Sequence, residues 1–169
     1  VTEAMVAFLA AGNASNIGNL VELGLQHEQQ HQELILMDIK HAFSLNPLKP
    51  AYRSSSARTG AAGKLGWREF ESGLVEIGHD GQGFAFDNEG PRHRAWVDAF
   101  ALALRPVNRG EFLAFIEDGG YRRPEFWLSA GWDCVRQRDW QAPLYWEQRD
   151  GSWMIYTLSG LERLDPSRP

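Results

Sequence analysis

The sequence has 169 residues, of which 43% are hydrophobic and 12% aromatic, enough to build the core of one ordinary domain or two small ones. Its net charge of −5, and the mixing of arginines with acidic residues after residue 90, exclude the basic face that a nucleic-acid partner would need. No apolar run approaches the roughly 20 residues that cross a bilayer, and the start lacks the features of a secretory signal. We therefore expect a cytoplasmic protein with no membrane contact. The single cysteine, Cys134, excludes an intrachain disulfide.

The first part of the chain is predicted to be helical. A short apolar helix is expected over residues 2–11 and a long one over about 17–43, on the spacing of their apolar positions. The prolines of NPLKP then end the helical region, because proline cannot continue the amide ladder. Residues 51–66 are small and polar, and we interpret them as a linker.

After the linker, short β-like runs alternate with glycine and proline. WREFESGLVEIG and HRAWVDAFALALR are expected to form strands. PLYWEQ and SWMIYTL are expected to form a hairpin, because Arg149-Asp150-Gly151 between them is a turn sequence.

Two helices are expected to interrupt these strands, near residues 109–118 and 124–138, the first ended by Gly119 and Gly120. The sequence therefore predicts the α+β class. The expected parts are a helical region at 1–50, a linker at 51–66 and a mixed α/β domain at 67–169.

Two histidines lie within the long helix, in the stretch LGLQHEQQHQELILMDIKHAF. His27 and His31 are four residues apart, which places them about 40° apart around the axis and roughly 6 Å along it, so that their rings can converge on one ion. Leucine and isoleucine continue the same face, and we therefore expect both imidazoles to be buried. A metal ion would satisfy two buried imidazoles; hydrogen bonds from neighbouring helices are the alternative.

Other polar residues of this helix are less suited to the same ion. Asp38 is placed to orient an imidazole or to pair with a cation, and the sequence does not choose between these roles. His41 lies about 21 Å along the axis from His27 and cannot bind the same ion.

HEQQH also matches the H-E-x-x-H pattern of zinc proteases, in which the glutamate is the general base. Since no third ligand of that class follows, a zinc metallohydrolase is kept as the alternative function.

The stretch HEQQHQELILMDIKHAF resembles the iron-binding helix of the ergothioneine-biosynthesis sulfoxide synthases, which carry H-x3-H-x-E in a DinB-like four-helix bundle. GFAFDNEGPRH, GGYRRPEFWLSAGW and APLYW are similar to the opening of the second domain of those enzymes, which has the C-type-lectin-like fold of the formylglycine-generating enzyme. The resemblance covers nearly all of the chain. It implies the C-terminal part of a DinB-like bundle followed by the N-terminal half of a formylglycine-generating-enzyme-like domain.

The resemblance implies a function. Enzymes of this family use non-heme Fe(II) and O2 to join the thiol of γ-glutamylcysteine or cysteine to the imidazole of hercynine (trimethylhistidine), and they oxidise the sulfur to a sulfoxide. His27 and His31 match two of the three iron ligands, and Gln30 matches a position near the trimethylhistidine pocket. A solvent-facing glutamine is an equally open interpretation of Gln30.

The chain also departs from the family pattern. Family enzymes take their third histidine from an earlier helix, but no histidine precedes His27 here, and the family pattern continues beyond LSGLERLDPSRP. We therefore expect an internal fragment that is inactive alone. His79 and His93 are the remaining candidates for a third ligand.

Self-association or a partner chain is expected to cover the apolar face of the long helix. The competing functional class is a non-catalytic lectin-like interaction module.

Two further features are open to a structural or a functional interpretation. Asp87, Asn88 and Glu89 could form an oxygen-rich cation site, but we favour hydrogen bonds that anchor a loop. The seven tryptophans, Trp127 and Trp146 included, could form a cage for a quaternary ammonium group, but we expect them to fill the core.

Overall fold

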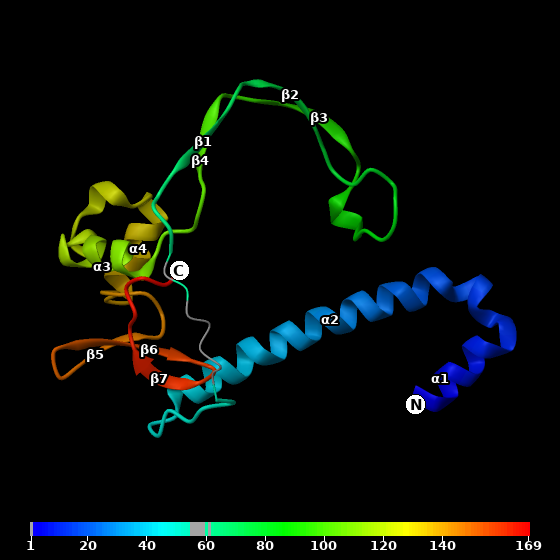
Figure 1. Ribbon diagram of the computed structural model, residues 1–169, viewed down its shortest axis with the longest axis horizontal. Coiled ribbons are helices and arrows are strands. Elements are labelled where there is room, and N and C mark those ends of the chain that lie inside the picture. The colour runs from blue at the N-terminus through cyan, green and yellow to red at the C-terminus, as the bar shows by residue number, and fades with distance from the viewer. Residues whose placement is uncertain (1, 55–59, 61) are drawn as a thin grey trace. The chain divides into compact units, whose positions relative to one another are not determined.

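The computed structural model describes residues 2–54, 60 and 62–169, and the chain divides into two compact units (Figure 1). Unit 1 comprises Val1–Met37 and Glu71–Ala99, and unit 2 comprises Asp38–Phe70 and Phe100–Pro169. The architecture is α+β, as the sequence predicts. Within the described residues, no helix combines the length and the apolar character that crossing a membrane requires.

The N-terminal region is helical. Helix α1 (Thr2–Phe8) leads through a π-helical stretch (Leu9–Asn13) into α2 (Ala14–Leu45), so both predicted helices are present. The chain bends at Gly12, whose φ of 87° is accessible to glycine at little cost. Helix α2 ends just before NPLKP, which confirms the predicted stop.

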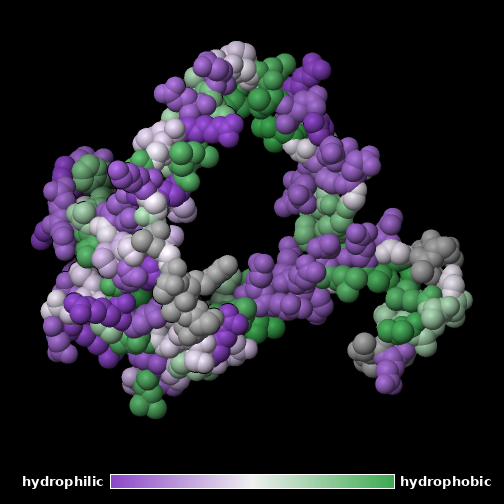
Figure 2. Space-filling model, viewed as in Figure 1, coloured by the Kyte–Doolittle hydropathy of each residue, from purple (hydrophilic) through white to green (hydrophobic). Residues whose placement is uncertain are grey.

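Each of the two predicted strand runs contains two short strands. In unit 1, β2 (Gly73–Ile77) pairs antiparallel with β3 (His93–Val97), with Gly73 opposite Val97. In unit 2, β1 (Trp67–Phe70) pairs antiparallel with β4 (Phe100–Ala103). These are two-stranded ribbons, and apolar side chains reach their surface (Figure 2).

The helices of unit 2 are short. Helix α3 (Arg109–Glu117) ends before Gly119, whose φ of 81° stops the helix as predicted. The region predicted as a helix over 124–138 is instead a 3-10 turn, η4 (Pro124–Phe126), followed by α4 (Ser129–Gln137). A further 3-10 turn, η3 (Gly120–Arg122), follows α3 directly.

A three-stranded antiparallel sheet completes unit 2. Strands β5 (Trp146–Arg149) and β6 (Ser152–Thr157) form the predicted hairpin. Asp150 and Gly151 have φ of 49° and 73°, the left-handed pair that a tight hairpin turn uses. Strand β7 (Gly160–Arg163), which the sequence analysis did not predict, pairs with β6.

The segment that follows α2 contacts this sheet. Lys49 Nζ donates to the carbonyl of Ser44 at 2.6 Å, which satisfies a carbonyl at the helix end. Tyr156 is 1% exposed, and its hydroxyl donates to the Pro50 carbonyl at 2.5 Å. The buried apolar side chains of the described residues are Tyr156, Val135 and Leu164, so the core lies in unit 2.

Candidate metal centre

His27 and His31 lie side by side on successive turns of α2. Their Nε2 atoms are 3.3 Å apart, their ring centroids are 4.5 Å apart, and the ring planes meet at 64°. With metal–nitrogen bonds of about 2.1 Å, one ion would bind both atoms at an angle of about 100°, between tetrahedral and octahedral values. The donor pair therefore fits a metal ion, and without one the two rings share a hydrogen bond.

The two imidazoles are exposed, so the prediction of buried histidines is wrong. The apolar residues of the same face are exposed as well, Leu20 at 67% and Leu34 at 48%. Burial of a helix face depends on what packs over it. The segment 83–87 lines a pocket with Leu23 of this face, but His27 and His31 stay exposed. The helical spacing predicts that the two rings converge, but it does not predict whether they are buried.

Among the described residues, no third ligand joins the pair. Within the described residues, no group of three or more His, Cys, Asp or Glu side chains is arranged to hold a metal. Of the two candidate third ligands, His93 has its Nδ1 3.0 Å from the Pro91 carbonyl, while His79 has a buried Nε2 with no hydrogen-bond partner among the described residues. Gln30 and Asp38 are exposed on α2.

The Asp87–Glu89 cluster anchors a loop. It forms a 3-10 turn, η2 (Asp87–Glu89), in which the Glu89 carboxylate accepts the backbone N–H of Phe86 at 2.8 Å. The Glu89 carbonyl accepts the backbone N–H of His79 at 2.9 Å. These two hydrogen bonds of Glu89 are loop-anchoring contacts of the kind that we favoured for this cluster.

A second polar contact, in unit 2, was not predicted. The hydroxyl of Tyr145 is 3.4 Å from Nδ1 of His41, and Lys40 Nζ lies 4.2 Å from the centroid of the Tyr145 ring. Tyr145 has a φ of 73°, a strained value for a non-glycine residue. Burial and the charge of Arg109 lower the pKa of Lys40. The partners are about 100 residues apart in the chain, so no local pattern could reveal the contact.

Comparison with known proteins identifies the family. Residues 49–154, which include β1 to β5, α3 and α4 and end within β6, match the sulfatase-modifying factor enzyme 1-like domain. The chain belongs to the sulfatase-modifying factor enzyme 1-like family. This membership confirms the predicted relationship of the second part of the chain to the formylglycine-generating enzyme.

Curated relatives of this sulfatase-modifying factor enzyme 1-like chain extend the match to α2. A protein named "Hercynine oxygenase" from Mycolicibacterium thermoresistibile is 33% identical over 149 residues, which is 86% of this chain and 32% of the relative. The "Hercynine oxygenase" of Mycolicibacterium smegmatis is 29% identical over 126 residues, 73% of this chain and 29% of the relative. "Ergothioneine biosynthesis protein 1" of Schizosaccharomyces pombe is 32% identical over 82 residues, 48% of this chain and 8% of the relative.

These matches confirm the resemblance to the ergothioneine-biosynthesis sulfoxide synthases. The chain spans about a third of the length of the hercynine oxygenases that it matches.

Proposed function

We propose that this chain supplies two iron ligands and part of the second domain of a non-heme Fe(II), O2-dependent sulfoxide synthase of ergothioneine biosynthesis. The substrates would be hercynine, γ-glutamylcysteine or cysteine, and O2. The observation that carries the proposal is the convergence of the His27 and His31 Nε2 atoms at 3.3 Å. The relatives named hercynine oxygenase support the substrate, because the alignment with one of them covers 86% of the chain.

The proposed reaction balances with one O2 per product. The thiol and the imidazole each lose a hydrogen, a carbon–sulfur bond forms, one oxygen atom stays on sulfur and the other leaves as water. Bound iron would supply the redox chemistry with O2. In this chain His27 and His31 would hold the metal, and Gln30, within one helical turn of both, would offer an amide to the trimethylhistidine.

We also propose that residues 1–50 are the C-terminal part of a DinB-like bundle, that 51–66 are a linker and that 67–169 open the formylglycine-generating-enzyme-like domain. The exposed apolar face of α2 supports the bundle, since Leu20, Leu23 and Ile35 are 67%, 43% and 55% exposed and need a cover. Self-association or a partner chain would provide it. Light scattering of a folded, monomeric chain would contradict this part of the proposal.

The metal site is tested by anaerobic Fe(II) binding to the whole chain. We expect saturable binding that the double variant His27→Ala/His31→Ala loses. His41→Ala is the matched control, because His41 lies farther along the same helix, contacts Tyr145 and should leave binding unchanged. A folded wild-type chain that binds no Fe(II), or a double variant that binds as well as the wild type, would overturn the proposal.

The reaction is tested with hercynine, thiol, Fe(II) and O2, followed by mass spectrometry for the sulfoxide. Because the described residues bring only two ligands together, we expect no sulfoxide from this chain alone. The H-E-x-x-H alternative makes a different prediction: Zn²⁺ would be preferred over Fe(II), and peptide hydrolysis would depend on Glu28. A folded chain that shows neither reaction and binds no Fe(II) would favour the non-catalytic module.

A further inference from the structure

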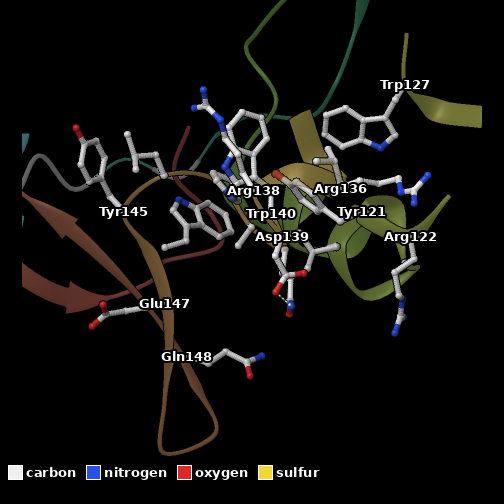
Figure 3. A pocket seen from close by; sticks show the side chains of 18 of the residues that line it. Tyr121, Arg122, Trp127, Arg136, Arg138, Asp139, Trp140, Tyr145, Glu147 and Gln148 are labelled. Atoms are coloured by element: carbon white, nitrogen blue, oxygen red, sulfur yellow. Dashed lines mark hydrogen bonds between the residues drawn. The ribbon is translucent and has the colours of Figure 1, made fainter. Parts of the chain in front are cut away.

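Unit 2 contains an open pocket of about 1640 Å³. Its walls come from α4 and the loop that follows, from the start of β5, from η3 and from the C-terminal part of α2. In Figure 3, Tyr145, Glu147 and Gln148 lie on the strand side, and Tyr121, Arg122 and Trp127 lie on the side of the short helices. All of these elements belong to unit 2, so the pocket is part of one compact body.

Tryptophan dominates the wall. Five of the seven tryptophans of the chain line the pocket, and none of the five is fully buried. Trp140 is 41% exposed, so the expectation that tryptophans fill the core is wrong for it. The other four are half-buried, and Trp127, Trp146 and Trp153 also pack against neighbouring aromatic rings. Half-buried indoles offer flat apolar faces to a planar ligand. The five are Trp127, Trp132, Trp140, Trp146 and Trp153.

The charge of the wall is unbalanced. Arg122, Arg136 and Arg138 line the pocket, and within the described part of the chain none of them pairs with a carboxylate. Two carboxylates also line the pocket: Glu147 is 3.5 Å from Lys49 and pairs with Arg149, and Asp139 accepts a hydrogen bond from Gln141 at 3.5 Å. The three guanidinium groups therefore outnumber the two carboxylates, and guanidinium binds carboxylate and phosphate in a two-pronged geometry.

One of these arginines lies next to an indole. The Arg138 guanidinium is 5.4 Å from the centroid of the Trp140 ring. A ligand at this point of the pocket could therefore contact a cation and a flat aromatic face at once.

We propose that this pocket binds a small planar aromatic molecule that carries a carboxylate or a phosphate group. The indoles would stack on the ring, and the arginines around Trp140 would pair with the anionic group. A cage for a quaternary ammonium group is disfavoured here, because three unpaired arginines would repel it. The proposal does not depend on the metal centre, which lies in unit 1.

The test uses probes that separate ring from charge. Indole-3-acetate, indole and tryptamine share one ring and differ in charge, acetate lacks the ring, and adenosine monophosphate against adenosine tests phosphate in place of carboxylate. Indole N–H signals of the ¹⁵N-labelled whole chain report binding by site. Signals of the five pocket tryptophans should shift and saturate with indole-3-acetate or the monophosphate, while Trp67 and Trp96, outside the pocket, stay unchanged as internal controls.

The double variant Arg136→Gln/Arg138→Gln should weaken binding of the anionic probes about tenfold or more, the loss of roughly one charge-assisted contact. The variant Arg53→Gln/Arg163→Gln removes the same charge from exposed positions outside the pocket and should bind as the wild type does. Binding of tryptamine as tight as that of indole-3-acetate would overturn the proposal. So would equal weakening in both variants, or no saturable shift with any anionic probe at millimolar concentration.

Discussion

Arg105 and Glu111 form a two-pronged ion pair at the start of α3, in which Nη1 donates to Oε2 at 2.8 Å and Nη2 to Oε1 at 2.7 Å. The same carboxylate accepts the backbone N–H of Asn108 at 2.9 Å. The hydrogen bonds from Arg105, followed by the one from Asn108, lower the pKa of Glu111 from 4.5 to about 2. The pair thus joins the loop before α3 to the first turn of the helix.

This pKa predicts acid sensitivity. Because the folded-state pKa lies below the unfolded value, the stabilisation is present above about pH 4.5 and is lost as the pH falls toward 2. The variant Glu111→Gln should show a shallower fall of the thermal midpoint over this range than the wild type. Glu117→Gln, at the other end of α3, is the control. Identical pH profiles for Glu111→Gln and the wild type would contradict the assignment.

Asn108 caps α3. Its side-chain oxygen accepts the backbone N–H of Glu111 at 2.8 Å, which satisfies one of the unpaired donors of the first turn. Asn108→Ala should lower the free energy of unfolding by about 1 kcal/mol in urea titrations. Asn88→Ala, in an exposed turn, should change it far less. An Asn108→Ala chain as stable as the wild type would show that the cap contributes nothing.

The Tyr156 hydroxyl joins the sheet to the segment after α2. Tyr156→Phe keeps the packing of the 1%-exposed ring but leaves the Pro50 carbonyl without its donor, which should cost about 1 to 3 kcal/mol of unfolding free energy. Tyr52→Phe removes a hydroxyl from a side chain that is 49% exposed and is the matched control. Equal stabilities of the two variants would refute the role of this hydrogen bond.

Gly120 is required by close packing. A Cβ atom at this buried position would overlap the ring of Phe115, so Gly120→Ala should destabilise the chain by about 1 to 3 kcal/mol. Gly131, in α4, has room for a methyl group 3.5 Å from Trp127, and Gly131→Ala should be neutral or slightly stabilising because alanine favours the helix. Thermal unfolding of both variants tests the contrast, and similar losses would contradict it.

Local features of the fold, including the β5–β6 hairpin, could be predicted from the sequence, but pairings between distant strands could not. The stop of α2, the end of α3 at Gly119 and the turn at Asp150–Gly151 each depend on neighbours within a few residues, and all three are as predicted. The division of two long runs into four strands was missed, because β1 pairs with β4 and β2 with β3, and one sequence does not show which segments pair.

The same distinction applies to the sites. The convergence of His27 and His31 follows from helix geometry and was predicted. Their exposure and the pocket of unit 2 depend on segments far apart in the chain. The sequence did contain one indication of the pocket, a group of two tryptophans and two arginines within nine residues: Trp132, Arg136, Arg138 and Trp140. We interpreted the tryptophans as core, and the arginines beside them were the clue against that interpretation.

The two ribbons have a consequence for behaviour in concentrated solution. Within the described residues, each strand of β1–β4 and β2–β3 has a partner on one edge only, so the opposite edge presents unpaired amide and carbonyl groups. Apolar side chains accompany these edges, with Leu74 59% and Trp96 64% exposed. Such edges recruit strands from other molecules and seed aggregation. Charged side chains interspersed along the ribbons, such as Arg68 and Arg94, oppose that stacking, and their neutralisation would shorten the solution lifetime of the chain.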